Sequence, residues 1–161
     1  MPASKSNGPK SRGLTVAVNR RARYDYELHD RYDAGIELVG TEIKSIRDRN
    51  ISIAEGYARF VNGELWLYNV HIAIYAPARE NHDPRRPRRL LLHRRELDRL
   101  QREMGLKPRT TVVPLRMYLY NGLAKVEIAL ATGRRSYDRR QAIAERDANR
   151  AIQRGMRRDQ R

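Results

Sequence analysis

The 161-residue chain contains no cysteine, which excludes disulfide bonds and thiolate metal sites and is compatible with a reducing compartment. It also contains no apolar run of the roughly 20 residues that a membrane-spanning helix needs. The first ten residues lack the apolar core of a secretory signal. We therefore expect a soluble, cytoplasmic protein that does not bind a membrane.

The sequence also lacks the short motifs that most often mark an active site or a metal centre. No P-loop, nucleophile elbow or glycine-rich fingerprint occurs, and His29, His71 and His93 lie in separate segments without metal-ligand spacing. The pair His82-Asp83 could serve a metal-dependent phosphodiesterase, but an Asp-Pro step is more typical of a turn. We predict no enzymatic activity, no cofactor and no metal site, with the phosphodiesterase as a less favoured alternative.

Acidic residues are scarce relative to basic ones, because 19 Asp and Glu face 34 Lys and Arg, for a formal net charge of +15. So large an excess makes a polyanion the first partner to consider. An anionic membrane surface would call for a basic helix with a broad apolar face, and no segment has that pattern. Nucleic acid is therefore the favoured partner.

The positive charge is concentrated at the two ends of the chain. Residues 1–23 hold six basic and no acidic residues, and residues 134–161 hold ten basic and four acidic residues. The 110 residues between them are nearly balanced, with 18 basic and 15 acidic residues. This layout predicts a disordered basic N-terminal arm (1–18), a folded RNA-binding body (19–133) and a basic C-terminal tail (134–161).

Two Asn-Gly dipeptides divide apolar segments into predicted β-hairpins. One joins residues 57–61 to 64–68, and the other joins residues 112–120 to 123–131. Asn and Gly tolerate the positive φ angles of the tight turns whose twist matches that of paired strands. Apolar and polar residues alternate in the second hairpin, which predicts a half-buried antiparallel pair. Its predicted inward residues are Val113, Leu115, Met117, Leu119, Val126, Ile128 and Leu130.

Shorter patterns predict the remaining elements of the body. Residues 24–39 read as two strands or as one strand bent at Gly35, and residues 41–47 read as a short helix capped by Thr41. Apolar residues spaced at i, i+3 and i+7 predict a second helix over residues 93–104. Several short antiparallel strands with few helices predict a mainly β fold, an OB-like antiparallel β-barrel whose closure removes exposed strand edges.

Two segments interleave arginines with aromatic or other planar side chains, as expected of surfaces that bind phosphates and stack on unpaired bases. Residues 19–26 contain three arginines and two tyrosines, and residues 85–95 contain six arginines. Either segment alone could be a solvated charged loop. Two such segments together with two basic arms favour RNA binding.

The tail, read as a helix, carries only a thin apolar stripe. This stripe is too slight to hold the helix against a core, and arginines four residues apart repel one another. We therefore predict a tail that is disordered when free and becomes helical when RNA neutralises its arginines. The repelling arginines are Arg146, Arg150 and Arg154.

Several of these stretches resemble the SmpB family of SsrA-binding proteins. The matching segments are 19–23 (Asn-Arg-Arg-Ala-Arg), 33–47, 81–97, 126–140 and 145–147. They follow one another in the family's order over about residues 17–150. The long central segments are very specific, so the resemblance extends over most of the chain.

The resemblance implies a non-catalytic bacterial protein with an OB-type barrel that binds the tRNA-like domain of transfer-messenger RNA (tmRNA, or SsrA RNA). Such a protein stands in for the missing anticodon arm and delivers tmRNA to stalled 70S ribosomes for trans-translation. The tail then occupies the empty mRNA channel near the decoding centre, beside 16S rRNA. Elongation factor Tu is implied as a partner through the aminoacylated tmRNA. The alternative is a general single-stranded RNA or ribosome-associated OB-fold protein.

The resemblance also assigns roles to individual residues. Its RNA-binding positions map onto Asn19, Tyr26, Asp33, Leu91 and His93, although the family usually has glutamate where this chain has Asp33. The full predicted RNA-binding set is Asn19, Arg20, Arg21, Arg23, Tyr26, Asp33, Lys44, Arg47, Arg86, Arg88, Arg89, Leu91 and His93. The predicted ribosome-contacting tail set is Arg134, Arg135, Tyr137, Asp138, Arg139, Arg140, Arg146 and Arg150.

Overall fold

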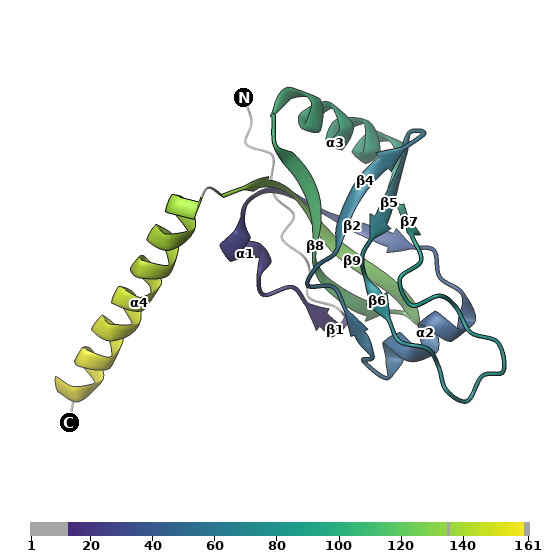
Figure 1. The fold of residues 1–161 in the computed structure, drawn as a ribbon, viewed down its shortest axis with the longest axis horizontal. Helices are drawn as coiled ribbons and strands as arrows, with labels where there is room; N and C mark the ends of the chain where they lie inside the picture. The colour runs from purple at the N-terminus through teal and green to yellow at the C-terminus, as the bar shows by residue number, and fades with distance from the viewer. Residues whose placement is uncertain (1–12, 135, 160–161) are drawn as a thin grey trace.

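The computed structural model describes residues 13–134 and 136–159 (Figure 1). A β-rich body is followed by a C-terminal helix that points away from it. The first twelve residues, which hold most of the predicted N-terminal arm, lie outside the described residues. In chain order the elements are β1 (Leu14–Val18), α1 (Ala22–Asp25), β2 (Tyr26–Ile36), α2 (Gly40–Arg47), β3 (Ile51–Ser52), β4 (Tyr57–Val61), β5 (Glu64–Tyr68), β6 (His71–Ile72), β7 (Arg88–Leu91), α3 (Arg94–Leu106), β8 (Thr110–Tyr120), β9 (Leu123–Gly133) and α4 (Ser136–Asp159).

Within residues 13–134, seven strands form one large antiparallel sheet in the order β1-β8-β4-β5-β7-β2-β9, and β8 also pairs with β9. Strands β3 and β6 form a two-stranded ladder of their own. Figure 1 shows α3 at one end of the sheet and α2 near the other end. The predicted mainly β architecture with small helices is confirmed.

Strand β1 lies inside the range predicted as a disordered arm. It pairs with β8, with Leu14 opposite Leu119 and Val18 opposite Arg116. Val16 is buried in the core, because the alternating pattern of this segment gives it one inward-facing side chain. In the described structure the body therefore begins at about residue 14 rather than residue 19.

Both predicted hairpins are confirmed. In the first, Asn62 and Gly63 have φ angles of 51° and 77°, and in the second, Asn121 and Gly122 have φ angles of 49° and 75°. Two successive positive φ angles are the signature of a type I′ turn, and both strand pairs continue in register from the turn.

A bulge in β8 overturns one prediction from the second hairpin. The pairing of β8 with β9 shifts register between Pro114 and Arg116, where proline has no N–H for the ladder. Met117 therefore points into the main core, whereas Val113 and Leu115, predicted to share its face, point the other way. These two residues belong to a second buried cluster on the opposite face of the sheet. Its members are Ala22, Val113, Leu115, Ala129 and Ala131.

The first helix of the predicted pair begins earlier than expected. Val39, not Thr41, is the cap of α2, and its backbone N–H donates to Oε1 of Glu42 over 3.0 Å. The Thr41 hydroxyl instead lies 2.8 Å from Nδ1 of His82. The predicted threonine cap is therefore wrong, because a glutamate in the first turn satisfies the backbone donor.

Helix α3 agrees with its predicted range to within two residues at its C-terminal end. Leu100 is fully buried in the main core, and Leu97 and Met104 pack against the same cluster. The spacing of these three side chains fixes which face of α3 covers the sheet.

Strand β2 is one long strand that follows the short helix α1. It pairs with β9 up to Gly35, and Gly35 also lies opposite Leu91 of β7. A Cβ at Gly35 would lie 3.3 Å from the Leu91 Cβ, so the missing side chain permits this close approach. The irregularity of the strand falls between Leu28 and Arg31, not at Gly35 where the sequence predicted the bend.

Helix α4 extends the tail away from the sheet (Figure 1). Its described side chains are exposed, including Ile143, Ile152 and Met156. The tail was predicted to be helical when bound to RNA, and its helical form agrees with that expectation. Its disorder in the absence of RNA stays a prediction. No described helix, α4 included, combines the length and hydropathy needed to cross a bilayer.

Candidate nucleic-acid interface

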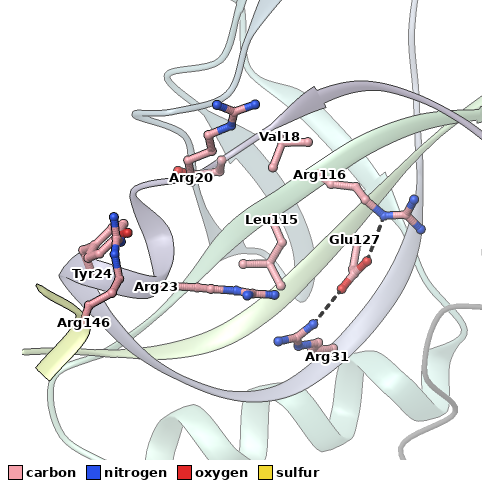
Figure 2. A pocket seen from close by; sticks show the side chains of 10 residues that line it. Val18, Arg20, Arg23, Tyr24, Arg31, Leu115, Arg116, Glu127 and Arg146 are labelled. Carbon is pink, nitrogen blue, oxygen red and sulfur yellow. Dashed lines mark hydrogen bonds and ion pairs between the residues drawn. The ribbon is translucent and has the colours of Figure 1, made fainter. Parts of the chain in front are cut away.

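A hollow of about 760 Å³ opens between α1, β2, β8 and α4 (Figure 2). We call it the arginine hollow, because it is lined by guanidinium groups that come from segments far apart in the sequence. Apolar side chains of Val18 and Leu115 form another part of its wall. The lining arginines are Arg20, Arg23, Arg31, Arg116 and Arg146.

Positive charge in the arginine hollow is only partly compensated. The carboxylate of Glu127 is buried and accepts from Nε of Arg116 over 3.1 Å and from Nη1 of Arg31 over 3.4 Å. Arg20 and Arg23 have no hydrogen-bond or ion-pair partner among the described residues. The hollow is therefore suited to an anion that supplies further acceptors.

An aromatic ring lies at the edge of the arginine hollow. The guanidinium of Arg146 lies 4.3 Å from the centre of the Tyr24 ring, in cation–π contact, and Figure 2 shows the two side chains stacked at one side. This contact joins α4 to α1. The tail is therefore part of the wall of the hollow.

Asn19 supports the fold between β1 and α1. Its side chain is only 6% exposed, and Nδ2 donates to the carbonyl of Pro114 over 2.9 Å. Its backbone N–H donates to the carbonyl of Leu115 over 2.8 Å. These bonds stabilise the β8 bulge, so the structure gives Asn19 an architectural role, and its predicted base contact stays a prediction.

Arg21 and Tyr26 lie on the other side of α1. They line a second hollow of about 410 Å³ together with Asp25 and Tyr57. The half-buried Tyr26 side chain also packs against the second apolar cluster. Its ring is therefore held in place from one side, as a stacking surface requires.

Asp33 is exposed but held in a fixed position. One carboxylate oxygen accepts from the hydroxyl of Tyr118 over 3.0 Å, and the Tyr118 ring lies 4.5 Å from the guanidinium of Arg116. Burial, and then the hydrogen bond to Asp33, raises the pKa of Tyr118 to about 12. The tyrosine therefore stays protonated, and keeps donating to Asp33, up to a higher pH than an ordinary tyrosine would.

Leu91 and His93 flank the end of β7. Leu91 is 48% exposed beside Gly35, and an exposed leucine at this position can contact a base or ribose. His93 caps α3 and lines a small hollow with Arg95 and Glu96. Both predicted contact residues are thus accessible.

Arg88 does not lie where an RNA contact would need it. Its side chain is 0% exposed, and its guanidinium donates to the Glu42 carboxylate and to the carbonyls of Val70 (2.9 Å) and Pro84 (3.1 Å). Burial lowers the pKa of Arg88, and the bonds to Glu42 counteract this effect. Its prediction as an RNA-binding residue is corrected, because every donor direction points into the protein.

Glu42 also bonds to Arg86, so one buried carboxylate joins Arg86 of the loop before β7 to Arg88, the first residue of β7. Nε of Arg86 lies 2.9 Å from Glu42 Oε1. Burial acts to raise the pKa of Glu42, but hydrogen bonds from Val39, Arg86 and Arg88 hold it below its ordinary value. Ion pairs with Glu42 therefore hold this segment against α2.

The remaining basic residues predicted to bind RNA differ in whether other side chains already engage them. Arg89 is engaged by two carboxylates, Glu37 at 2.9 Å and Glu64 at 3.1 Å. The Lys44 ammonium lies 5.4 Å from the centre of the Tyr75 ring. Arg47 is exposed and has no partner among the described residues.

His82 and Asp83 have structural contacts. Nε2 of His82 donates to the carbonyl of Ile72 over 2.9 Å, which leaves Nδ1 to accept from the Thr41 hydroxyl in the neutral ring. Asp83 accepts from the backbone N–H of Arg85 over 2.9 Å. The turn interpretation is confirmed, and the engaged imidazole gives no support to the phosphodiesterase.

The tail residues begin at a fixed point on the body. The backbone N–H of Arg134 donates to the carbonyl of Asp25 over 3.0 Å, and Arg140 and Arg150 are exposed on α4. Arg135 lies outside the described residues. The same holds for the side chains of three further predicted residues, Tyr137, Asp138 and Arg139.

Sequence reasoning missed part of the arginine hollow. Tyr24 lies inside a segment already singled out, but Arg31, Arg116 and Glu127 were not predicted as site residues. Arg116 and Glu127 are paired across β8 and β9. Opposite charges at paired positions of a predicted hairpin were the signal that could have found them.

Comparison with known proteins identifies what the chain resembles. The family model described as "SmpB protein" matches residues 16–158. The SsrA-binding protein of Thermobifida fusca (strain YX) is 52% identical over 158 residues, covering 96% of this chain and 94% of that protein. The SsrA-binding protein of Limosilactobacillus fermentum is 52% identical over 142 residues, covering 88% and 90%. A solved structure described as "tmRNA-SmpB: a journey to the center of the bacterial ribosome" has a TM-score of 0.63 at 44% identity, covering 81% of this chain and 94% of that one.

Proposed function

The chain belongs to the SmpB protein family, and from this premise we propose that it binds tmRNA and acts in trans-translation, the rescue of stalled ribosomes. The observation that carries the proposal is the 52% identity to an SsrA-binding protein over 96% of the chain. A solved relative, described with tmRNA and the bacterial ribosome, supports the same two partners. The protein acts by binding and delivery in the cytoplasm, without a catalytic step of its own.

The body is proposed to be an OB-like barrel. Its support is the pairing pattern, in which β8, β4, β5, β7, β2 and β9 are neighbours in turn and β9 pairs again with β8. Such a cycle leaves few unpaired edges in a small sheet. The arrangement also presents loop and strand residues on a rigid frame for RNA.

The tRNA-like domain of tmRNA is proposed to bind the face formed by Asp33, Leu91 and His93. Gly35 and Leu91 are paired across β2 and β7, which brings Asp33 and Leu91 to neighbouring positions. The face combines an exposed carboxylate, an exposed apolar side chain and an exposed imidazole. This mixture suits irregular RNA, where bases and ribose hydroxyls are accessible.

The tail is proposed to enter the vacant mRNA channel of the stalled ribosome, near the decoding centre. Its support is the extended geometry of α4 and the exposure of its basic residues, among them Arg140, Arg146 and Arg150. Elongation factor Tu joins the complex through the aminoacylated tmRNA. The helix becomes stable when rRNA phosphates neutralise its charge.

The test is binding to the isolated tRNA-like domain of tmRNA at physiological salt, in the presence of excess ordinary tRNA. Specific recognition predicts affinity that survives the competitor, with a salt slope of about −0.7 to −0.9 per phosphate contact. Equal competition by tRNA, with all binding lost at raised salt, would instead support the alternative of an undiscriminating RNA-binding protein.

A further inference from the structure

The second hollow, on the other side of α1 from the arginine hollow, has the chemistry of a cation site. We call it the tyrosine hollow, because Tyr26 and Tyr57 line it. We propose that it holds the lysine or arginine side chain of a basic protein segment that the ribosome presents. This inference rests on the proposed function, since the protein meets such a segment where it binds the ribosome.

The charge of the tyrosine hollow differs in sign from that of the arginine hollow. Its lining has two carboxylates, Asp25 and Glu55, and one guanidinium, that of Arg21. The arginine hollow has five arginines and one glutamate. Glu55 is exposed, and its carboxylate has no hydrogen-bond or ion-pair partner among the described residues. Because carboxylates repel phosphates, such a lining on a chain of net charge +15 favours a cationic partner over RNA.

The two tyrosine rings are held in place before a partner arrives. Tyr26 is half-buried and packs against the second apolar cluster. The Tyr57 ring stacks on the Tyr68 ring, with the ring centres 5.6 Å apart and the planes 16° from parallel. The guanidinium of Arg59 in turn lies 4.8 Å from the centre of the Tyr68 ring. Aromatic rings beside a carboxylate attract an ammonium or guanidinium group both through the ring and through the charge.

The turn before β4 fixes the position of Glu55. The backbone N–H of Gly56 donates to the carbonyl of Ile53 over 3.0 Å, and Nδ2 of Asn69 donates to the carbonyl of Glu55 over 3.2 Å. A Cβ at Gly56 would lie 2.7 Å from Cγ2 of Val70, so a side chain there would push the turn away from the body. The backbone of Glu55 is therefore held while its carboxylate stays available.

A buried acceptor in the lining lacks a donor. Asn19 lines the tyrosine hollow and is 6% exposed, and its Oδ1 accepts no hydrogen bond from the described residues. Buried acceptors are nearly always paired, so this oxygen is suited to a donor that a partner supplies. A guanidinium or an ammonium group supplies donors, whereas an ionised phosphate supplies acceptors.

The size and position of the tyrosine hollow suit one long side chain. Its volume of about 410 Å³ lies in the range of roughly 300–1,000 Å³ typical of small-ligand sites. Asp33, Leu91 and His93, which form the face proposed for tmRNA, do not line it. A protein segment bound here therefore leaves that face accessible. The prediction that Tyr26 contacts RNA is the competing assignment, and the sign of a charge change separates the two.

The first experiment removes the free carboxylate in the full chain. Glu55→Gln should weaken binding to vacant 70S ribosomes about three- to tenfold, because the cation of the partner loses its counter-charge. Glu80→Gln, at an exposed glutamate without a described partner, is the matched control and should change this affinity by less than about 1.5-fold. RNA at the hollow would give the opposite sign, since Glu55→Gln removes a charge that repels phosphates. Neither variant should change the affinity for the isolated tRNA-like domain of tmRNA.

A pair of variants at one position tests the aromatic part. Tyr57→Phe keeps the ring and should keep the affinity for 70S ribosomes, whereas Tyr57→Leu should lose about threefold or more. Thermal melting of both variants checks that β4 is still folded. If Tyr57→Leu does not fold, Glu55→Gln alone decides the outcome.

Crosslinking identifies what occupies the hollow. Because the chain contains no cysteine, a single introduced cysteine carries a photoactivated crosslinker at one known position. Ala54→Cys places it at an exposed position in the lining and keeps Glu55, and Ala76→Cys places it at an exposed position elsewhere. On purified 70S ribosomes, we expect the label at position 54, and not the label at position 76, to join a lysine- or arginine-containing peptide of one ribosomal protein.

Three outcomes would overturn the inference. Tighter ribosome binding by Glu55→Gln, or crosslinks from position 54 to RNA, would assign the hollow to RNA. Equal effects of Glu55→Gln and Glu80→Gln would mean that only the overall charge matters. The absence of any protein crosslink from position 54 above that from position 76 would leave the hollow without a protein partner. Failure of the unmodified protein to bind the tRNA-like domain would instead contradict the proposed function, and the ribosome comparison would remain readable.

Discussion

Two arginine-rich segments that look alike in the sequence have opposite surroundings in the folded protein. In residues 19–26, Arg23 lines an open hollow and has no described partner. In residues 85–95, Arg88 is fully buried and bonded to Glu42. The difference shows that the density of arginines does not decide which of them can reach RNA. An arginine can reach RNA only where the fold does not bring a carboxylate from a distant segment to bind it.

The largest expected effect comes from removing the buried ion pair of the segment 85–95. Arg88→Met should lower the free energy of unfolding by about 3–5 kcal/mol, because it leaves the buried Glu42 carboxylate without its main partner. Urea unfolding at pH 7 measures this loss. The affinity of the folded fraction for the tRNA-like domain should stay the same.

An exposed arginine of the same arginine-rich segment (85–95) provides the control for this prediction. Arg85 is exposed and bonds to Asn69 over 2.7 Å, so Arg85→Met should cost less than about 1 kcal/mol. Replacing both members of the buried pair, Glu42→Leu with Arg88→Met, should recover part of the loss. Equal stability of the two single variants would contradict the comparison between buried and exposed arginines.

The next effect concerns Asn19, a buried polar residue of the segment 19–26. Asn19→Ala should lower the free energy of unfolding by about 1–3 kcal/mol, since it leaves the Pro114 carbonyl without a donor at the bulge. Asn149→Ala, at an exposed position of α4, is the matched control and should change stability by less than about 0.5 kcal/mol. If Asn19→Ala instead weakened tmRNA binding and left stability unchanged, Asn19 would be a contact residue after all.

A smaller effect depends on pH. The folded protein raises the pKa of Tyr118 to about 12 from its ordinary 10.0, so the folded state keeps a proton that the unfolded chain loses. Stability is therefore fully present below about pH 10 and falls as the pH rises toward about 12. Tyr118→Phe should make this fall shallower between about pH 10 and about pH 12, measured by urea unfolding. Tyr32, whose pKa burial also raises to about 12, should leave a residual slope.

The smallest effect comes from removing the exposed ion pairs of the segment 85–95. Arg89→Gln removes pairs with Glu37 and Glu64 and should change the free energy of unfolding least of these variants, because both carboxylates are exposed to solvent. The difference from the unmodified protein should vanish in 1 M salt, where exposed charges are screened. A loss as large as that of Arg88→Met would mean that burial does not separate the two arginines.

Local chemistry was sufficient to predict several elements. The Asn-Gly turns, the apolar face of α3 and the excess of β structure follow from neighbouring residues. The bulge at Pro114 was not predictable from alternation, because a one-residue shift in pairing depends on the partner strand. The hydrogen bonds from Arg86 and Arg88 to Glu42 join residues more than 40 positions apart. The arginine hollow likewise combines segments that only the tertiary fold brings together.

The attachment of α4 makes the tail a lever. At about 1.5 Å per residue, its 24 residues extend about 36 Å from the body. A rotation of about 10° at the hydrogen bond between Arg134 and Asp25 would move the far end by about 6 Å, more than the rise of one helical turn. Arg146 lies about 15 Å along this lever, so its contact with the Tyr24 ring limits the swing of everything beyond it.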